Sequence, residues 1–158
     1  MQVEVVRSSR RRRTVQARQL GEVVRVTIPA TMTKAEEDRW VAEMLRRIER
    51  HQHTADVDLM QRALDLARGH GLPVPKEVRW VDNQRFRWGS CTPVDGTIRI
   101  SSRLAGFPDW VLDYVLMHEL AHLEVPHHDR RFWELVERYP LSERARGYLL
   151  AKETEATA

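Results

Sequence analysis

Residues 109–123 read DWVLDYVLMHELAHL, and this stretch decides how the rest of the chain is interpreted. Apolar residues occupy almost every face of the helix that the stretch predicts, so we expect that helix to lie in the core. Pro108 precedes the stretch and suits the first helical position. Pro126 disfavours the helical conformation at Val125, so the helix is expected to end close to Glu124.

Three polar residues within this stretch form an H-E-x-x-H motif: His118, Glu119 and His122. Residues four apart share one face of a helix, so both histidines can direct an imidazole at one metal ion. Glu119 lies about 100° further round the helix, where its carboxylate can touch a metal-bound water without being a ligand. The motif therefore predicts a metal centre with a Lewis acid and a general base. Histidines that serve only packing are the alternative, but burying these three groups is costly unless a metal or another partner satisfies them.

A catalytic zinc has three protein ligands and one open position, so a third ligand is expected further along the chain. His128 lies six residues after His122, which is the spacing of the third histidine in the longer H-E-x-x-H-x-x-G-x-x-H pattern. The glycine of that pattern is replaced here by Val125, so the turn must be made differently. Three other side chains remain as alternative ligands: His127, Glu137 and Glu143.

The composition is typical of a soluble globular protein, since 42% of the 158 residues are hydrophobic and 31% are charged. No apolar run is long enough to span a membrane, so no membrane association is expected. Cys91 is the only cysteine, which excludes an internal disulfide and suits a reducing compartment. No apolar segment follows the basic residues of 1–13, so a secretory signal is not expected and a cytoplasmic location is predicted.

We expect a single domain over residues 1–158, with four successive parts. These parts are N-terminal strands in 1–30, a helical pair in 31–75, the metal-site core in 76–139 and a C-terminal helix and tail in 140–158.

Hydrophobic periodicity and turn residues place the individual elements. Residues 1–30 alternate apolar and polar side chains and predict an antiparallel meander of three strands. Thr33 and Glu36 form a capping box that opens a helix over 34–50. The other expected elements are a helix over 56–70, strands over 78–81 and 97–101, and a helix over 130–138 with Asp129 as its N-cap.

The charge distribution suggests a nucleic-acid partner as an alternative. The formal net charge is +3 and the sequence pI is about 9.4, and the consecutive arginines Arg10–Arg13 can form a phosphate-binding patch. No aromatic residues that could stack on bases are interleaved with them. The favoured interpretation of this run is therefore a solvated hairpin turn that blunts a sheet edge.

Three motifs, in this order along the chain, resemble one known family. They are RWGSC at 87–91, DYVLMHELAHL at 113–123 and a histidine followed by Phe-Trp at 128–133. Over residues 79–139 the chain resembles the YgjP-like metallopeptidases, zincin-type proteins similar to SprT-like and WLM-type proteases. The resemblance implies an α+β, zincin-like fold in which an antiparallel β-sheet packs against the buried H-E-x-x-H helix and several further helices. One edge of that sheet is expected to pair with an extended peptide.

The same resemblance implies a site and an activity. Zinc is expected to be bound by His118, His122 and His128, with Glu119 as general base. The implied enzyme is a zinc metalloendopeptidase that acts on protein or peptide substrates. One alternative is a nucleic-acid-associated metal-binding protein, or a protease that acts on DNA-bound proteins. Another is a metal-binding interaction protein with little turnover. The family tends to have an asparagine where this chain has Ser101–Ser102, so any substrate contact made by that asparagine is not expected here.

Several roles stay open at this point. A donor that stabilises the oxyanion is expected, and the candidates are Tyr114, His127, Arg131 and Tyr139. A side chain that orients a ligand histidine is also expected, and the candidates are Asp113, Glu124 and Asp129. In the RWGSC motif, Gly89 is expected to allow a close backbone approach, Trp88 to pack on the H-E-x-x-H helix and Cys91 to fill space beside that helix.

Overall fold

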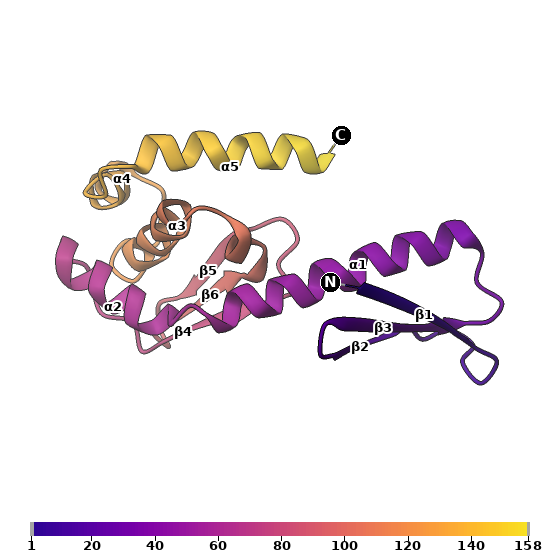
Figure 1. Cartoon of the computed structure of the whole chain (residues 1–158). Coiled ribbons are helices and arrows are strands. Elements are labelled where there is room, and N and C mark those ends of the chain that lie inside the picture. Colours follow the sequence, from indigo (N-terminus) through magenta and orange to yellow (C-terminus); the bar gives the residue numbers. More distant parts are fainter. Residues whose placement is uncertain (1, 158) are drawn as a thin grey trace. The chain divides into compact units, whose positions relative to one another are not determined.

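The computed structural model describes residues 2–157 (Figure 1). The chain divides into two compact units, Met1–Gln52 and His53–Ala158, and each is described by itself. The single domain expected for residues 1–158 stays a prediction. Within the part of the chain that the structure describes, no helix is both long and apolar enough to cross a membrane.

The first unit contains a three-stranded sheet whose central strand is β3. The strands are β1 (Gln2–Ser8), β2 (Gln16–Leu20) and β3 (Val23–Pro29), in the order β1-β3-β2. β2 pairs with β3 antiparallel, as expected, but β1 pairs with β3 in parallel. The predicted antiparallel meander is therefore wrong. β3 has the most completely buried alternating residues, so it takes the centre and the two more polar strands flank it.

This strand order changes the setting of the arginine run. Residues 9–15, which include Arg10–Arg13, connect the two outer strands and do not form a hairpin turn between neighbouring strands. Arg11 donates hydrogen bonds to Thr14 Oγ1 at 3.0 Å and to the side-chain oxygen of Gln16. One of the four arginines is therefore engaged in ordering the connection itself.

Helix α1 (Lys34–Ala55) begins at the predicted capping box. The Thr33 amide donates to Glu36 Oε2 at 2.9 Å, and the Glu36 amide donates to Thr33 Oγ1 at 3.3 Å. The helix continues past the predicted end at residue 50, because residues 51–55 contain no proline or glycine that would stop it. Met44 from this helix packs with the buried residues of β3.

The second unit contains a three-stranded sheet and four α-helices. Its strands are β4 (Glu77–Val81), β5 (Gly89–Thr92) and β6 (Thr97–Ser101), and its helices are α2 (Leu59–His70), α3 (Asp109–His122), α4 (Arg130–Val136) and α5 (Ser142–Thr157), with a short 3-10 helix η1 (Ser102–Gly106). The α+β class is confirmed. The sheet has the order β4-β6-β5 and is mixed, because β4 runs parallel to β6 and β5 runs antiparallel to it. The expected antiparallel pairing thus holds only for β5 with β6.

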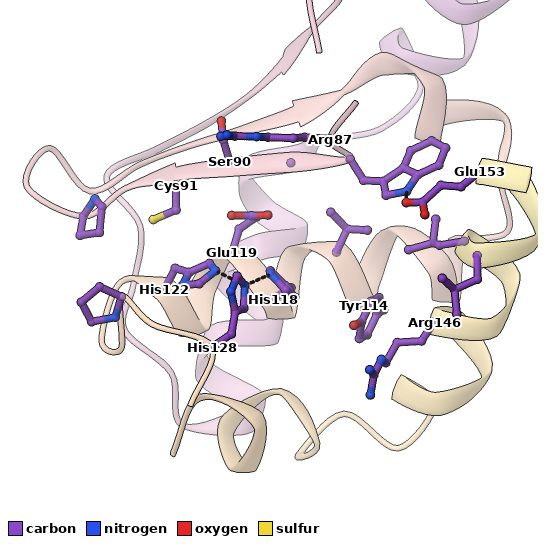
Figure 2. Close-up of a pocket in the computed structure, with 17 residues that line it drawn as sticks. Arg87, Ser90, Cys91, Tyr114, His118, Glu119, His122, His128, Arg146 and Glu153 are labelled. Atoms are coloured by element: carbon purple, nitrogen blue, oxygen red, sulfur yellow. Dashed lines mark hydrogen bonds between the residues drawn. The ribbon is translucent and has the colours of Figure 1, made fainter. Parts of the chain in front are cut away.

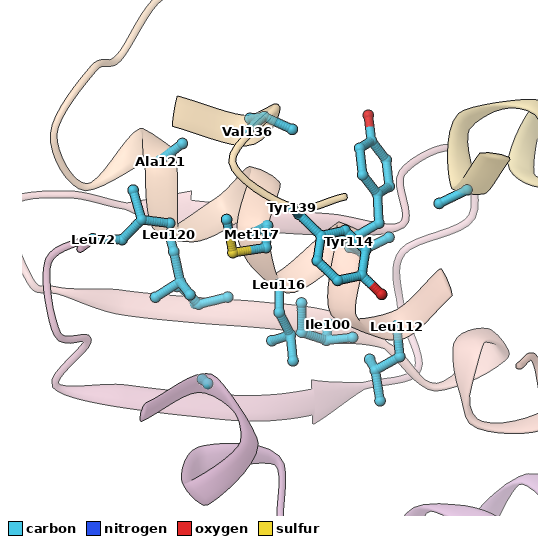
Figure 3. Packing of buried hydrophobic residues seen from close by; sticks show 14 of the residues in the cluster. Leu72, Ile100, Leu112, Tyr114, Leu116, Met117, Leu120, Ala121, Val136 and Tyr139 are labelled. Atoms are coloured by element: carbon cyan, nitrogen blue, oxygen red, sulfur yellow. The ribbon is translucent and has the colours of Figure 1, made fainter. Parts of the chain in front are cut away.

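Helix α3 is the core helix, as its apolar periodicity predicted. Leu116, Met117 and Leu120 are fully buried, and they belong to one cluster with Ile98 and Ile100 of β6 (Figure 3). Burying each such side chain contributes about 1.5–3 kcal/mol to folding. The H-E-x-x-H motif is therefore fixed on the most strongly packed element of this unit.

The segment after α3 turns the chain back toward that helix. Leu123 and Glu124 continue the last turn, and Pro126 then lies before the loop that leads into α4. Asp129 is the N-cap of α4, because its Oδ1 accepts a hydrogen bond from the Phe132 amide at 3.0 Å. The predicted cap is confirmed. It fixes where α4 begins, directly after residues 127 and 128.

Candidate metal centre

Three histidine side chains converge at the end of α3 (Figure 2). His128 Nε2 lies 3.1 Å from His118 Nε2 and 3.1 Å from His122 Nε2. His118 and His122 come from successive turns of α3, and His128 comes from the loop that follows Pro126. His127, the rival ligand from sequence, is exposed and lies outside this group within residues 2–157.

The tautomer of His122 is set by the backbone. His122 Nδ1 lies 3.0 Å from the Val125 carbonyl oxygen, which can only accept, so Nδ1 carries the proton and donates it. Nε2 of the same ring therefore presents its lone pair to the other two histidines. A backbone carbonyl thus does the orienting that we expected from a carboxylate.

The donor set fits a tetrahedral divalent metal such as zinc. Zinc–nitrogen bonds of about 2.0–2.1 Å separate two tetrahedral ligand atoms by about 3.3–3.4 Å. The separations of 3.1 Å from His128 Nε2 to the other two nitrogens are close to that value. His128 Nε2 also has either one proton or one lone pair, so at most one of its two contacts can be a hydrogen bond. A cation between the three rings satisfies all of them.

Aromatic rings from α4 support the three histidines, which we call the histidine triad. The Phe132 ring centroid lies 4.8 Å from His118, 4.4 Å from His122 and 4.8 Å from His128. Phe132 is fully buried, so it forms an apolar floor under the site. The Trp133 ring stacks on His128 at 5.9 Å, with an interplanar angle of 28°. The motif at 128–133 singled out both residues but gave no sign of this contact.

His118 and His122 are favoured in the neutral form that a metal requires. Burial chiefly, and then the neighbouring His122 and His128, lower the pKa of His118 to about 3. Burial also lowers the pKa of His122, although the hydrogen bond to Val125 opposes the change.

Glu119 is buried beside the triad and is not among its converging atoms. Its residue exposure is 6%, and burial raises the pKa of its carboxyl group to about 8, opposed by the charge of Arg87. The carboxylate is therefore a base that is held in a site of low polarity next to three imidazoles. That arrangement suits proton transfer to and from a reacting group.

Gly89 leaves the space that the Glu119 side chain occupies. A Cβ atom at Gly89 would lie 2.8 Å from Glu119 Oε1 and 2.9 Å from its Cγ, closer than real Cβ contacts. Gly89 begins β5, so the close approach expected from the RWGSC motif is made to the catalytic candidate itself. The spacing between the two motifs gave no indication of this contact.

The other residues of the RWGSC motif lie in the same wall. The Trp88 ring packs on Phe107 at 5.5 Å, and its Nε1 donates to Glu153 Oε1 of α5 at 2.9 Å. Cys91 is half-buried and packs against the core, as expected, and it also lines the cavity. Burial, with a smaller contribution from Glu119, raises the pKa of the Cys91 thiol to about 11.

A cavity of about 710 Å³ opens over the triad and Glu119. Its lining includes β5 on one side and α5 on the other, so both elements bound the space where a substrate can lie (Figure 2). The α5 residues that line it are Arg146, Leu149, Leu150 and Glu153. None of these was singled out from sequence, because α5 has no motif and lies far from α3 in the chain.

Several residues that the sequence suggested as histidine-orienting or oxyanion-stabilising groups form hydrogen bonds or ion pairs with residues outside the triad. Asp113 Oδ1 accepts from Arg62 Nε at 2.5 Å, and Glu124 Oε1 accepts from Arg131 Nη2 at 2.6 Å. Tyr139 Oη donates to the Trp110 carbonyl at 3.1 Å. Of the four oxyanion candidates, which all lie in the described part of the chain, Tyr114 alone lines the cavity.

The fold resembles that of two solved metallopeptidases. The crystal structure of the metallopeptidase zymogen of Pyrococcus abyssi abylysin is 29% identical, covers 62% of this chain and 91% of its own, and has a TM-score of 0.50. The crystal structure of the metallopeptidase zymogen of Methanocaldococcus jannaschii jannalysin is 15% identical, covers 61% of this chain and 97% of its own, and has a TM-score of 0.52. At this identity, the similarity to jannalysin concerns the fold alone. The expected zincin-like fold is confirmed.

No curated protein matches the chain. A family model matches it and also indicates a metallopeptidase. Residues 54–149, which are more than half of the chain and contain the triad, Glu119 and the RWGSC motif, match the model of the YgjP-like metallopeptidase domain. The chain belongs to the YgjP-like metallopeptidase family.

Proposed function

We propose that this metallopeptidase is a zinc-dependent endopeptidase that hydrolyses peptide bonds in protein or peptide substrates. The observation that carries the proposal is the convergence of three histidine Nε2 atoms beside a buried glutamate, at the base of one cavity. His118, His122 and His128 would hold the metal, and their imidazole set with one open position is typical of catalytic zinc. When bound, zinc polarises a carbonyl group and lowers the pKa of water.

Glu119 would carry the proton. Its carboxylate takes a proton from the attacking water and delivers it to the nitrogen of the leaving amine. Gly89 supports this role, because it lets the carboxyl group lie against β5 without a steric clash. Tyr114 is the candidate donor to the oxyanion, since it lines the cavity one helical turn before His118.

β5 would hold the substrate in extended form. It is an edge strand in the order β4-β6-β5 and it borders the cavity. The edge of a sheet binds an extended peptide through main-chain hydrogen bonds, which need no particular side chain. This mode supports cleavage within a chain, because both ends of an extended peptide can leave the cavity.

Metal content of the purified protein tests the site. We expect about one zinc per chain in the wild type and in His127→Ala, and a loss of most of it in His128→Ala. His127 is the matched control, because it is the adjacent histidine and lies outside the triad. Equal zinc content in both variants would contradict the three-histidine site.

Digestion of an unfolded protein such as casein tests the activity. Wild-type protein loaded with zinc should produce internal fragments, and Glu119→Gln should lose about 10²–10⁴-fold in rate while it keeps the metal. No cleavage by zinc-loaded wild type, or unchanged cleavage by Glu119→Gln, would contradict the proposed mechanism. The nucleic-acid alternative stays a prediction; Arg10–Arg13 lie in the first unit, outside the residues that match the family.

A further inference from the structure

Arg146 places a positive charge in the wall of the cavity. It comes from α5 and lines the same cavity as the triad, on the side where Tyr114 lies (Figure 2). Nothing in the proposed proton transfer or metal binding uses this side chain. An arginine beside a catalytic cavity therefore needs another explanation.

The Arg146 guanidinium contacts an aromatic ring next to the triad, and its side chain is 44% exposed. It lies over the Trp133 ring at 4.6 Å, and the Trp133 ring in turn stacks on His128. A cation over an indole ring is attracted to its face. A guanidinium group can bind a carboxylate in bidentate fashion through two of its N–H donors. The contact with Trp133 thus places such a donor group near the triad.

The donors of Arg146 are only weakly engaged. Among the described residues, its one hydrogen bond runs from Nη1 to Glu143 Oε1 at 3.4 Å. Glu143 is 82% exposed in its side chain, and such surface pairs contribute little and exchange readily. A substrate carboxylate can therefore replace Glu143 or share the guanidinium with it.

Arg146 shares the lining of the cavity with Tyr114 and with apolar side chains, among them Val115 of α3 and Leu149 of α5. A cation next to apolar surface suits a group with methylene carbons and a terminal carboxylate, such as a glutamate side chain.

We propose that Arg146 is a specificity residue that binds a substrate carboxylate on the α5 side of the scissile bond, so that this peptidase prefers acidic substrates. The proposal rests on the proposed function, because it assigns a subsite to the same cavity. The carboxylate can come from a glutamate or aspartate side chain or from the free C-terminus of the substrate. The positive charge in the cavity lining and the weak bond to Glu143 favour a carboxylate over any neutral group.

Arg144 provides a matched control for Arg146. It lies on the same helix and its guanidinium also covers a tryptophan, Trp110, at 4.8 Å. It does not line the cavity within the described residues. A substitution to glutamine at either position removes one positive charge and one cation–aromatic contact from α5. A difference in substrate preference between the two variants therefore reports on the position of Arg146 in the cavity.

The first measurement is the cleavage pattern. Zinc-loaded wild type, Arg146→Gln and Arg144→Gln digest the same casein, and mass spectrometry identifies the residues on both sides of each cleaved bond. We then make two pairs of peptides from the strongest cleavage site and measure kcat/KM for each peptide. The first pair differs in having glutamate or glutamine, and the second differs in having a free or an amidated C-terminus. These two pairs distinguish a side-chain carboxylate from a terminal one.

We expect wild type and Arg144→Gln to prefer one of the two carboxylate peptides by about ten- to hundredfold in kcat/KM. Arg146→Gln should lose that preference, chiefly through a raised KM for the carboxylate peptide. Arg146→Glu should instead favour a lysine peptide. No preference in the wild type, or an equal loss on both peptides in Arg146→Gln, would overturn the proposal.

Binding gives a second readout that does not need turnover. Zinc-loaded Glu119→Gln is titrated with three peptides in a calorimeter. The first is an N-acetylated, C-amidated alanine hexapeptide that contains one glutamate, and the second has glutamine in its place. The third is the alanine hexapeptide with a free C-terminus. We expect one carboxylate peptide to bind about tenfold or more tightly than its neutral counterpart, and Arg146→Gln in the same background to abolish the difference. Equal binding of all peptides would overturn the proposal. If the wild type cleaves nothing while this binding difference persists, only the proposed function fails.

Discussion

The close contact between Gly89 and Glu119 leads to a prediction about a single methyl group. In Gly89→Ala the new Cβ would lie 2.8 Å from Glu119 Oε1 and 2.9 Å from its Cγ, so the Glu119 side chain must shift. A shift of about 1 Å in a catalytic group costs about 10²-fold in rate. We expect kcat for a peptide substrate to fall by about that factor while the zinc content and the fold stay as in the wild type.

Gly147→Ala is the control for this variant. A Cβ atom at Gly147, on α5, meets nothing within 4 Å, so activity should not change. Wild-type kcat in Gly89→Ala would mean that Glu119 does not need its observed position.

Cys91 also allows a test at the scale of one residue. Because burial raises the pKa of its thiol to about 11, the reactive thiolate is scarce at neutral pH although the residue lines the cavity. We expect alkylation by iodoacetamide at pH 7.5 to be roughly a hundredfold slower than in the guanidinium-unfolded chain. The rate should rise about tenfold per pH unit up to about pH 11. A rate that levels off near pH 8.5 in the folded protein would contradict the raised pKa.

Pairs of helices in the second unit are joined by specific ionic contacts. Arg62 of α2 donates from Nε to Asp113 Oδ1 at 2.5 Å and from Nη2 to Oδ2 at 3.3 Å, so α2 and α3 share a bidentate pair. Both side chains are mostly buried, with exposures of 28% and 20%. Arg62→Gln should therefore lower the free energy of unfolding by about 1–3 kcal/mol in chemical denaturation.

Arg68→Gln is the comparison on the same helix. Arg68 is exposed, so the change in unfolding free energy should stay within about 0.5 kcal/mol. Neither variant should alter zinc content, because Asp113 contacts no histidine of the triad among its described hydrogen bonds. An equal effect of the two substitutions would show that the pair does not stabilise the α2–α3 contact.

At the scale of the whole molecule, the two compact units should respond differently to metal. The triad lies entirely in the second unit, so zinc bound as proposed should stabilise the folded form of that unit. At a free zinc concentration one hundred times Kd, we expect a gain of about 2.7 kcal/mol. Hydrogen exchange should show stronger protection in α3 and residues 123–129 on zinc addition, and no change in β1, β2 or β3.

His128→Ala should not respond to zinc in the same experiment, since it lacks one of the three proposed ligands. Equal protection of both units in the wild type would show that zinc acts elsewhere or that the units unfold together.

The cytoplasmic location inferred from the single cysteine stays a prediction, as does the domain count.

Several helices and their ends could be predicted from local sequence. The helix at 109–123 and its buried character follow from its apolar residues, and the common face of His118 and His122 follows from helical geometry alone. The capping box of α1 and the N-cap of α4 were also correct, because each depends on a side chain and an amide three residues apart.

Strand direction and order could not be predicted in the same way. Alternation of apolar and polar residues marks a strand but says nothing about which neighbour it pairs with, and short turns favoured a meander that the structure does not have. The buried residues of β3 decide that it is central, and that decision depends on packing against the rest of the first unit.

The sequence by itself determined the chemistry of the candidate site: two histidines and a glutamate on one helix, a third histidine after a proline, and the family that these motifs indicate. Only the tertiary structure decided which residues surround that chemistry. Gly89 against Glu119, Phe132 beneath the triad and Arg146 in the cavity wall all join segments far apart in the chain. Such contacts arise when the elements pack together, and no local periodicity or spacing encodes them.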